Sequence, residues 1–199
     1  MRRRICALMM TLVLLTGCSG RGQYAGQSAE ELALSIRTEY LAMSVCETTV
    51  DITADYGQRV YEYSMEVFWQ KNGETRLTVT APDSIAGITA RIRDGNSFLE
   101  YDGASMETGV LSGTGLSPIE VVPAALNYIL SGYIAECDFE TTDERELLWF
   151  CCRDPESEPG VGTEAEFWFD TQSHALTQAE ILSDGYCVIR CMFQEFTME

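Results

Sequence analysis

The sequence predicts an α+β fold in which a single curved antiparallel sheet, of about ten or eleven strands, carries two helices on its concave face. Apolar and polar residues alternate with a period of two through most of residues 47–101 and 134–197. Helical periodicity is confined to Ser28–Cys46 and Ser117–Gly132. Because a sheet of that length has to curl, two helices with one apolar stripe each are expected to pack on its concave side. The predicted architecture is an unclosed half-barrel with an N-terminal helix and a mid-chain lid helix.

Residues 1–17 have the features of a signal peptide. Three arginines precede the apolar run Ile5–Leu15, and small residues lead up to Cys18,. A run of eleven residues is too short for a membrane-spanning helix, which takes about 20. The segment Leu15-Thr16-Gly17-Cys18 resembles the lipobox of bacterial lipoproteins, whose cysteine receives acyl chains such as palmitate before cleavage. The resemblance implies that Cys18 is the lipidated first residue of the mature chain and anchors it to the extracytoplasmic face of the cell membrane.

The mature chain is predicted to begin with a tether and to continue as one domain. The residues after Cys18 are small and polar up to Gln27, as in a flexible linker,. We therefore assign residues 18–27 to the lipidated cysteine and tether, and residues 28–199 to a single domain. Ser28-Ala29-Glu30-Glu31 is a capping box that starts the first helix,. The apolar stripe of this helix consists of Leu32, Ile36, Tyr40 and Met43,.

A meander of antiparallel strands is predicted after the first helix. Beyond residue 47, strands are expected at Tyr61–Trp69, Thr75–Ala81, Ile88–Ile92 and Ser97–Tyr101,. Asn72-Gly73 and Asp94-Gly95 are the expected hairpin turns,. Arg91 and Arg93 lie on the same face of one strand,. We favour pairing of these arginines with carboxylates, and the alternative is that they bind an anionic head group. The strand pattern stops after Tyr101.

The second helix is predicted from Ser117-Pro118-Ile119-Glu120, a second capping box with proline at the first helical position,. Gly132 is expected to end this helix and Pro123 to bend it early,. Its apolar stripe makes Leu126, Ile129 and Leu130 candidates to line a cavity under the lid,. Strands are then expected at Ala135–Thr141, Glu146–Arg153, Glu164–Asp170, Leu176–Ser183 and Cys187–Thr197,.

The order of these elements resembles the LolA/LolB family of lipoprotein carriers. The most telling segment runs from Phe167 to Glu180 and contains a strand, an Asp-initiated turn and the start of the next strand. The family usually has a Thr-Gly-Leu-Pro-type sequence there, whereas His174 and Thr177 replace its glycine and proline here. The resemblance implies an unclosed barrel with helices as a lid, in which carriers hold acyl chains. A clostridial spore-germination lipoprotein of this fold acts instead by binding a peptidoglycan amidase.

The charge balance excludes nucleic acid as a partner. The chain has 13 basic and 31 acidic residues. Cleavage before Cys18 removes three basic residues and no acidic one, which leaves a formal charge of −21. Phosphate backbones bind patches of Lys and Arg, and this acidic protein has none. The same charge disfavours adsorption to anionic lipid, so the membrane contact is assigned to the covalent anchor.

Six cysteines follow Cys18, namely Cys46, Cys137, Cys151, Cys152, Cys187 and Cys191. An even number of cysteines in an exported protein permits disulfides. However, Cys187 and Cys191 are separated by about 13 Å along one predicted strand, beyond disulfide reach. The adjacent Cys151 and Cys152 point to opposite faces of their strand. We favour buried thiols, with one or two disulfides or an intermolecular disulfide as alternatives.

The sequence does not predict an enzyme, a cofactor or a metal site. The only histidine, His174, lies in a predicted turn, and there is no CxxC motif,. No nucleophile with a base partner is recognisable. The acidic stretch Glu136–Glu146 alternates with apolar residues, which favours a solvated sheet face over paired catalytic carboxylates,.

Two functions remain. One is the binding of a lipid or acyl ligand in the half-barrel cavity, beneath a movable lid. The alternative is an interaction module that binds and supports an envelope protein, such as a peptidoglycan amidase in spore germination. A lined cavity beneath Ser117–Gly132 would favour the first function, and a packed interior would favour the second.

Replacing Cys18 with Ala should release the protein from membranes, because only this cysteine follows the lipobox triplet,. Metabolic labelling with a fatty-acid analogue, followed by membrane fractionation, checks this. Label that persists in the Cys18→Ala protein would contradict the assignment.

Overall fold

The computed structural model describes residues 27–142 and 145–199. The predicted signal peptide, Cys18 and nearly all of the tether lie outside the described residues. The described chain has two helices, α1 (Ala29–Ala42) and α2 (Val121–Ser131). Its strands are β1 (Val45–Asp55), β2 (Val60–Gln70), β3 (Thr75–Ala81), β4 (Thr89–Arg93), β5 (Asn96–Tyr101), β6 (Ala104–Val110), β7 (Ile134–Thr141), β8 (Glu146–Cys152), β9 (Thr163–Asp170), β10 (Leu176–Ser183) and β11 (Tyr186–Met198).

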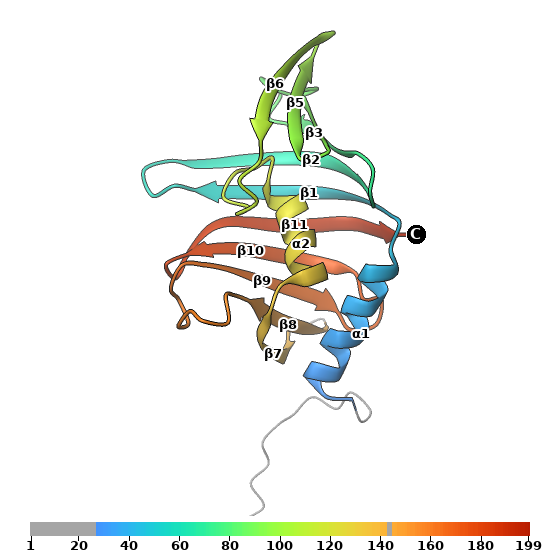
Figure 1. The fold of residues 1–199 in the computed structure, drawn as a ribbon, viewed down its shortest axis with the longest axis vertical. Helices are drawn as coiled ribbons and strands as arrows, with labels where there is room; N and C mark the ends of the chain where they lie inside the picture. The colour runs from blue at the N-terminus through green and yellow to red at the C-terminus, as the bar shows by residue number, and fades with distance from the viewer. Residues whose placement is uncertain (1–26, 143–144) are drawn as a thin grey trace, which may run out of the picture.

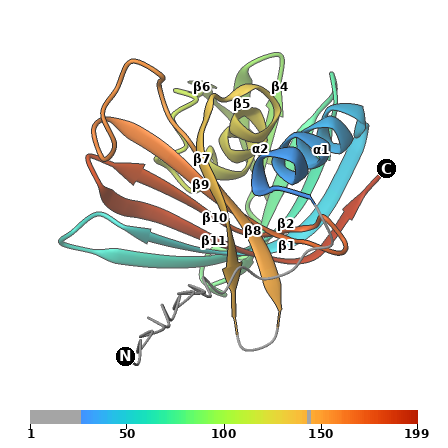
Figure 2. The ribbon, with the colours of Figure 1, turned by 90° about the horizontal axis from the view of Figure 1, so that it is seen from below.

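All eleven strands form one antiparallel sheet in the order β6-β5-β4-β3-β2-β1-β11-β10-β9-β8-β7. The two halves of the chain each form a meander, and β11 returns to pair with β1 in the middle. α2 carries the chain from β6 at one end of the sheet to β7 at the other (Figure 1). The sheet is curved and both helices lie inside the curve (Figure 2). The predicted unclosed half-barrel with helices on its concave face is confirmed.

Several hairpins form where the sequence has Asp-Gly. In Asp94-Gly95, Asp102-Gly103 and Asp184-Gly185 both residues have positive φ, which a two-residue turn of type I′ requires. Such turns match the twist of the strands that they join, so they set the register of the meander locally.

α1 begins as predicted and ends earlier than predicted. Ser28 Oγ accepts a hydrogen bond from the Glu31 N–H, and Glu31 Oε2 accepts one from the Ser28 N–H, each at 3.2 Å. The helix ends at Ala42, and Cys46 lies in β1 opposite Trp69, not in the helix. The prediction to Cys46 was wrong because the period-two pattern of β1 already starts at Val45 and pairs with two neighbouring strands.

The prediction of a second capping box, at Ser117–Glu120, was also wrong. α2 begins at Val121, and Pro118 lies in a turn before it. The Glu120 carboxylate accepts hydrogen bonds from the N–H (2.6 Å) and the hydroxyl (2.7 Å) of Ser112, so it does not close a box with Ser117. Pro123 occupies the first turn of the helix, where an N–H has no partner within the helix to lose,. Gly132 caps the C-terminus, as expected.

β6 was not predicted, and its burial pattern explains why. It is exposed along almost its whole length. Apolar and polar residues therefore do not have to alternate in it, which removes the signal that identifies a strand. The other strands agree with the prediction except at their ends and at the start of β1.

The core lies between the helices and the concave side of β7–β11, β1 and β2. Its largest fully buried side chains include Tyr40 of α1, Leu126 and Ile129 of α2, and Phe150, Phe167 and Phe169 of β8 and β9. The rings of Phe150 and Phe169 stack at 5.1 Å, and Tyr40 meets Phe169 edge to face at 5.5 Å, geometries that aromatic pairs prefer.

Leu126→Asp should lower the free energy of unfolding by more than about 3 kcal/mol, because it puts a charge into this core. Asn127→Asp is the matched control, since Asn127 is exposed on the same turn of α2. Urea denaturation of both variants checks the difference. Equal stability of the two variants would show that α2 does not hold its place against the sheet.

Candidate functional site

The predicted lining residues of α2 lie in the packed interior. Leu126 and Ile129 are 1% and 0% exposed, and Leu130 is half-buried against the same cluster. Five hollows of about 270 to 510 Å³ indent the described chain, and none of these five has a residue of α2 in its wall. The space beneath α2 is thus occupied by the side chains of the helix itself.

Side chains from other elements hold both ends of α2. At its C-terminus, Arg37 of α1 donates hydrogen bonds from Nε to the Ile129 carbonyl (2.7 Å) and from Nη2 to the Tyr128 carbonyl (3.4 Å). A cation there meets the negative end of the helix dipole. At the N-terminal end, Glu120 is bonded to Ser112 and the Tyr56 hydroxyl donates to the Leu116 carbonyl at 3.1 Å. These contacts fix both ends of α2.

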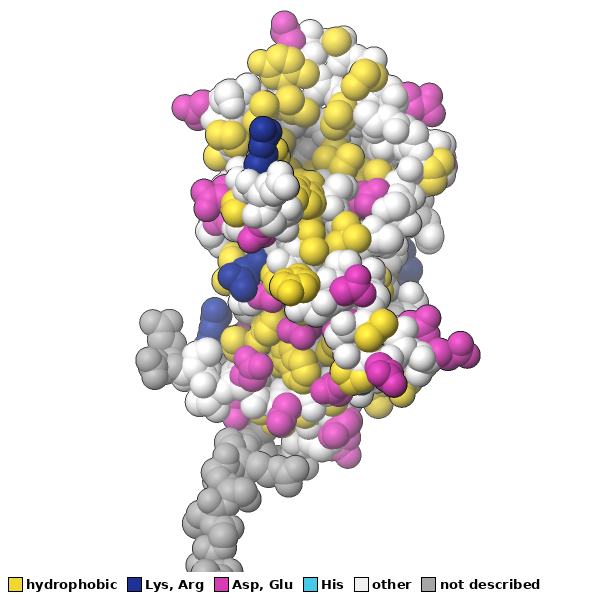
Figure 3. Space-filling view, turned by 90° about the vertical axis from the view of Figure 1, so that its left-hand side faces the viewer, with side chains coloured by type: hydrophobic (Ala, Val, Ile, Leu, Met, Phe, Trp, Pro, Cys, Tyr) yellow, Lys and Arg dark blue, Asp and Glu magenta, His cyan; other side chains and the backbone are white. Residues whose placement is uncertain are grey.

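The concave face continues beyond α2 as an exposed apolar surface on β4–β6. Leu99 of β5 lies opposite the buried Ala90 on one side and Met106 of β6 on the other, so all three share the concave face,. Ile88, Leu99, Tyr101 and Met106, which we call the apolar shelf, surround a hollow of about 270 Å³. Tyr101 and Met106 are 57% and 61% exposed. Figure 3 shows hydrophobic side chains gathered at this upper end of the molecule.

A row of three tyrosines borders the N-terminal end of α2. The rings of Tyr56 and Tyr61 are 6.2 Å apart, and those of Tyr61 and Tyr63 stack at 6.4 Å. Tyr61 and Tyr63 lie opposite the buried Ala54 and Ile52 of β1, hence on the concave face. Burial, followed by the neighbouring tyrosines, raises the pKa of Tyr56. The concave face beside the N-terminal end of α2 is therefore aromatic.

Arg91 and Arg93 do not join the residues of α2. They project from the face of β4 opposite to the buried Ala90,. Arg91 lies 3.0 Å from Glu74 and 2.8 Å from Glu100, and Arg93 lies 2.9 Å from Glu74. The carboxylate pairing that we favoured is thus present in the structure, and the five candidate residues fall into two separate places.

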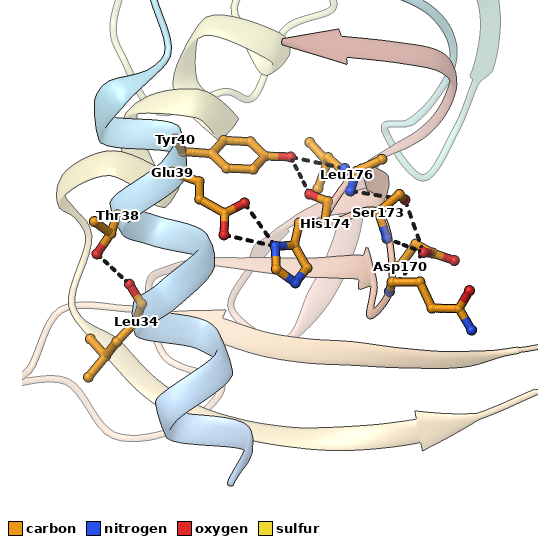
Figure 4. A network of polar contacts seen from close by, with 10 residues as sticks. Leu34, Thr38, Glu39, Tyr40, Asp170, Ser173, His174 and Leu176 are labelled. Carbon is orange, nitrogen blue, oxygen red and sulfur yellow. Dashed lines mark hydrogen bonds and ion pairs between the residues drawn. The ribbon is translucent and has the colours of Figure 1, made fainter. Parts of the chain in front are cut away.

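The single histidine joins α1 to the turn between β9 and β10 (Figure 4). Nδ1 of His174 is 2.8 Å from a carboxylate oxygen of Glu39. The buried Tyr40 hydroxyl donates to the His174 carbonyl at 3.1 Å and accepts from the Leu176 N–H at 3.0 Å. Burial raises the pKa of Tyr40 well above its ordinary value. His174 thus has a structural contact that fixes α1 on the sheet.

The six described cysteines are free thiols, and four of them are buried. Burial raises the pKa of Cys46 and Cys151 to about 12 and that of Cys152 to about 11. The thiolate is the reactive form of cysteine, so these groups are poor nucleophiles at neutral pH. The favoured expectation of buried thiols holds for Cys46, Cys151, Cys152 and Cys191, while Cys137 and Cys187 are half-buried.

Within residues 27–142 and 145–199, no group of three or more His, Cys, Asp or Glu side chains has a metal-binding arrangement. No helix in that part of the chain is both long and apolar enough to cross a membrane. The candidate surface that sequence reasoning missed is the apolar shelf. Asp102-Gly103 was the available signal for it, since this hairpin turn places β6 and Met106 beside β5.

The sequence matches no protein-family model and no curated protein. Solved structures do match it. A conserved protein of Thermus thermophilus, itself uncharacterized, is 13% identical with a TM-score of 0.51, and the match covers 87% of this chain and 88% of that one. A LolA superfamily protein from Nitrosomonas europaea is 11% identical with a TM-score of 0.43, covering 87% and 94% of the two chains.

A further match is to the structure of the CwlD amidase from Clostridioides difficile in complex with the GerS lipoprotein. The matched chain of that structure is 12% identical to this protein, with a TM-score of 0.47, and the match covers 89% of this chain and 100% of that one. At these identities the likeness is one of fold alone. The unclosed half-barrel that the LolA/LolB resemblance implied is the fold that the structure has.

Tyr40→Phe should lower the free energy of unfolding by about 1–3 kcal/mol, because the buried N–H of Leu176 loses its acceptor. Tyr186→Phe, at a tyrosine that is 79% exposed, is the control and should leave stability unchanged. Urea denaturation measures both. An unchanged midpoint for Tyr40→Phe would show that a water or another group replaces the hydroxyl.

Proposed function

We propose that this protein is a lipid-anchored, non-enzymatic envelope lipoprotein that holds a partner protein on its apolar shelf. The observation that carries the proposal is the exposure of Tyr101 and Met106 on the same face of the sheet as the core. Aromatic residues and methionine are enriched in the buried centres of protein interfaces. An exposed apolar patch of this kind marks a site where a partner or a ligand binds.

The packed interior supports a protein partner over an enclosed ligand. Pockets that bury a small molecule usually measure about 300–1,000 Å³, whereas the hollow on the apolar shelf is about 270 Å³ and open. Leu126 and Ile129 fill the space where an acyl chain would otherwise enter beneath α2. With α2 packed in this way, the protein offers an open surface rather than an enclosed cavity.

Anchoring at Cys18 would place this surface at the membrane. The lipobox resemblance puts the acyl chains on Cys18, with nine residues between it and Ser28, where α1 is capped. A short tether keeps the domain close to the bilayer while leaving the shelf free to turn toward a neighbour in the envelope. Retention beside the membrane raises the effective concentration of the domain for such a partner.

A second candidate function is the binding of an acyl ligand, and the lining of the shelf favours it. Ile88, Leu99, Tyr101 and Met106 present mainly carbon atoms to the hollow. A longer chain would have to continue beneath α2, which requires the contacts of Arg37 and Glu120 at the two ends of the lid to break. Part of an acyl chain would fit the shelf without that movement.

A photo-crosslinking amino acid at Met106 distinguishes the two functions in the native host. The same probe at Tyr186, which is exposed on the other half of the sheet, is the matched control. We expect a discrete protein adduct from position 106 that position 186 does not give, measured by mass spectrometry. The adduct should disappear when Tyr101→Ser is added. A lipid adduct at position 106 would support the carrier function, and equal adducts from both positions would contradict a binding role for the shelf.

A further inference from the structure

β7 is the end of the sheet opposite to the apolar shelf. Its inner side pairs with β8, and its outer side pairs with no other strand of the described chain. Such an edge carries a row of main-chain donors and acceptors that another extended segment can use. The edge begins next to α1, which contacts β7 and β8 (Figure 2).

Side chains alternate regularly along this edge. Glu136, Asp138 and Glu140 are exposed on one face of β7, and Cys137 and Phe139 are half-buried on the other. Each of the three carboxylates has a contact. Arg153 lies 2.7 Å from Glu136, and the Trp168 indole N–H donates to Glu140 at 2.8 Å. Asp138 Oδ1 accepts the Phe139 N–H of the same strand at 2.8 Å, so this main-chain donor already has a partner that an added strand would replace. The edge therefore presents carboxylates on one face and apolar groups on the other at the spacing of a strand.

A hollow of about 510 Å³ runs over the edge. Leu34 of α1 and Ile134 and Cys137 of β7 line it, and so do Glu136 and Asp138. Trp149 of β8 also lines it and lies opposite Asp138, hence on the face of the sheet that carries the carboxylates,. Leu34 is largely exposed. Side chains on one face of an added strand would meet Leu34, Ile134 and Cys137, and those on its other face would meet Trp149 and the carboxylates.

Carboxylates also lie on the same face of β9 and β10, the third and fourth strands from this edge, where Arg190 pairs with Glu180 at 2.7 Å. Glu166 of β9 lies directly opposite Glu180 of β10. Burial raises the pKa of Glu166, and the negative charges of Glu180, Glu164 and Glu140 raise it further. Figure 3 shows acidic side chains gathered at this lower end of the molecule. Cations on a partner would relieve this repulsion, whereas the edge of a second copy would add to it.

We propose that the outer edge of β7 binds an extended, basic segment of a partner protein, which adds to the sheet as a twelfth strand. Its lysines or arginines would face Asp138 and its neighbours, and its apolar residues would enter the groove beside Leu34. This site does not depend on the function proposed for the shelf, because the two lie at opposite ends of the sheet.

A fluorescein-labelled nine-residue peptide in which lysine alternates with valine, with blocked ends, is the probe. Fluorescence anisotropy is measured on the mature protein in nanodiscs of phosphatidylcholine, which does not attract the peptide by charge. We expect saturable binding that weakens as salt is added. N-methylation of alternate residues keeps the charge and removes the main-chain donors, so it should weaken binding about tenfold or more.

Asp138→Lys should weaken binding about threefold or more, because it replaces an attractive cross-strand pair by a repulsive one. Glu107→Lys, at an exposed carboxylate on the other edge strand, β6, is the matched control and should not change binding. Hydrogen exchange should show that the peptide protects amides of β7 and not those of β6.

Equal binding of the N-methylated peptide would overturn the proposal, because it would reduce the interaction to charge attraction. Equal loss in both variants, protection at β6, or no binding would also overturn it. Self-association of the protein through β7, seen by sedimentation and abolished by Asp138→Lys, would identify a second copy as the occupant instead.

Discussion

The structure depends on covering the apolar concave face of an eleven-stranded sheet with two short helices. Eleven strands spaced by about 4.8 Å give a sheet about 48 Å wide. At 1.5 Å per residue, α1 and α2 are only about 21 and 16 Å long, and each is about 10 Å across. The helices therefore cover part of the face. They bury the half with Phe150, Phe167 and Phe169 and leave the shelf on β4–β6 exposed.

The position of α2 in the chain gives it a second role. It connects β6 to β7, the two strands that end the sheet, so the cover of the core is also the link between the two proposed binding surfaces. Arg37 fixes its C-terminus to α1, while Glu120 and Tyr56 fix the region before it. A partner that displaced one end of α2 would have to replace these hydrogen bonds.

The distribution of charge follows from how few basic residues the chain has. Five of its arginines, Arg37, Arg91, Arg93, Arg153 and Arg190, are used to hold a helix terminus or a carboxylate in place. Most acidic residues of the described chain are exposed, so its negative charge lies at the surface. Such a surface repels nucleic acid and anionic lipid and attracts cationic segments.

The sequence by itself determined the half-barrel, because period-two alternation, two helical stripes and Asp-Gly turns are local patterns that burial on one face imposes. It also indicated the apolar stripe of α2, whose Leu126 and Ile129 are buried, and it predicts a lipobox at Cys18. The tertiary structure alone decided which carboxylates pair with Arg91, that Glu120 bonds Ser112 rather than closing a capping box, and that β6 exists. These features depend on contacts between distant residues, or on exposure to solvent, and neither leaves a periodic pattern in the chain. The shelf and the free edge of β7 are of this kind, because strand order sets which surfaces remain uncovered.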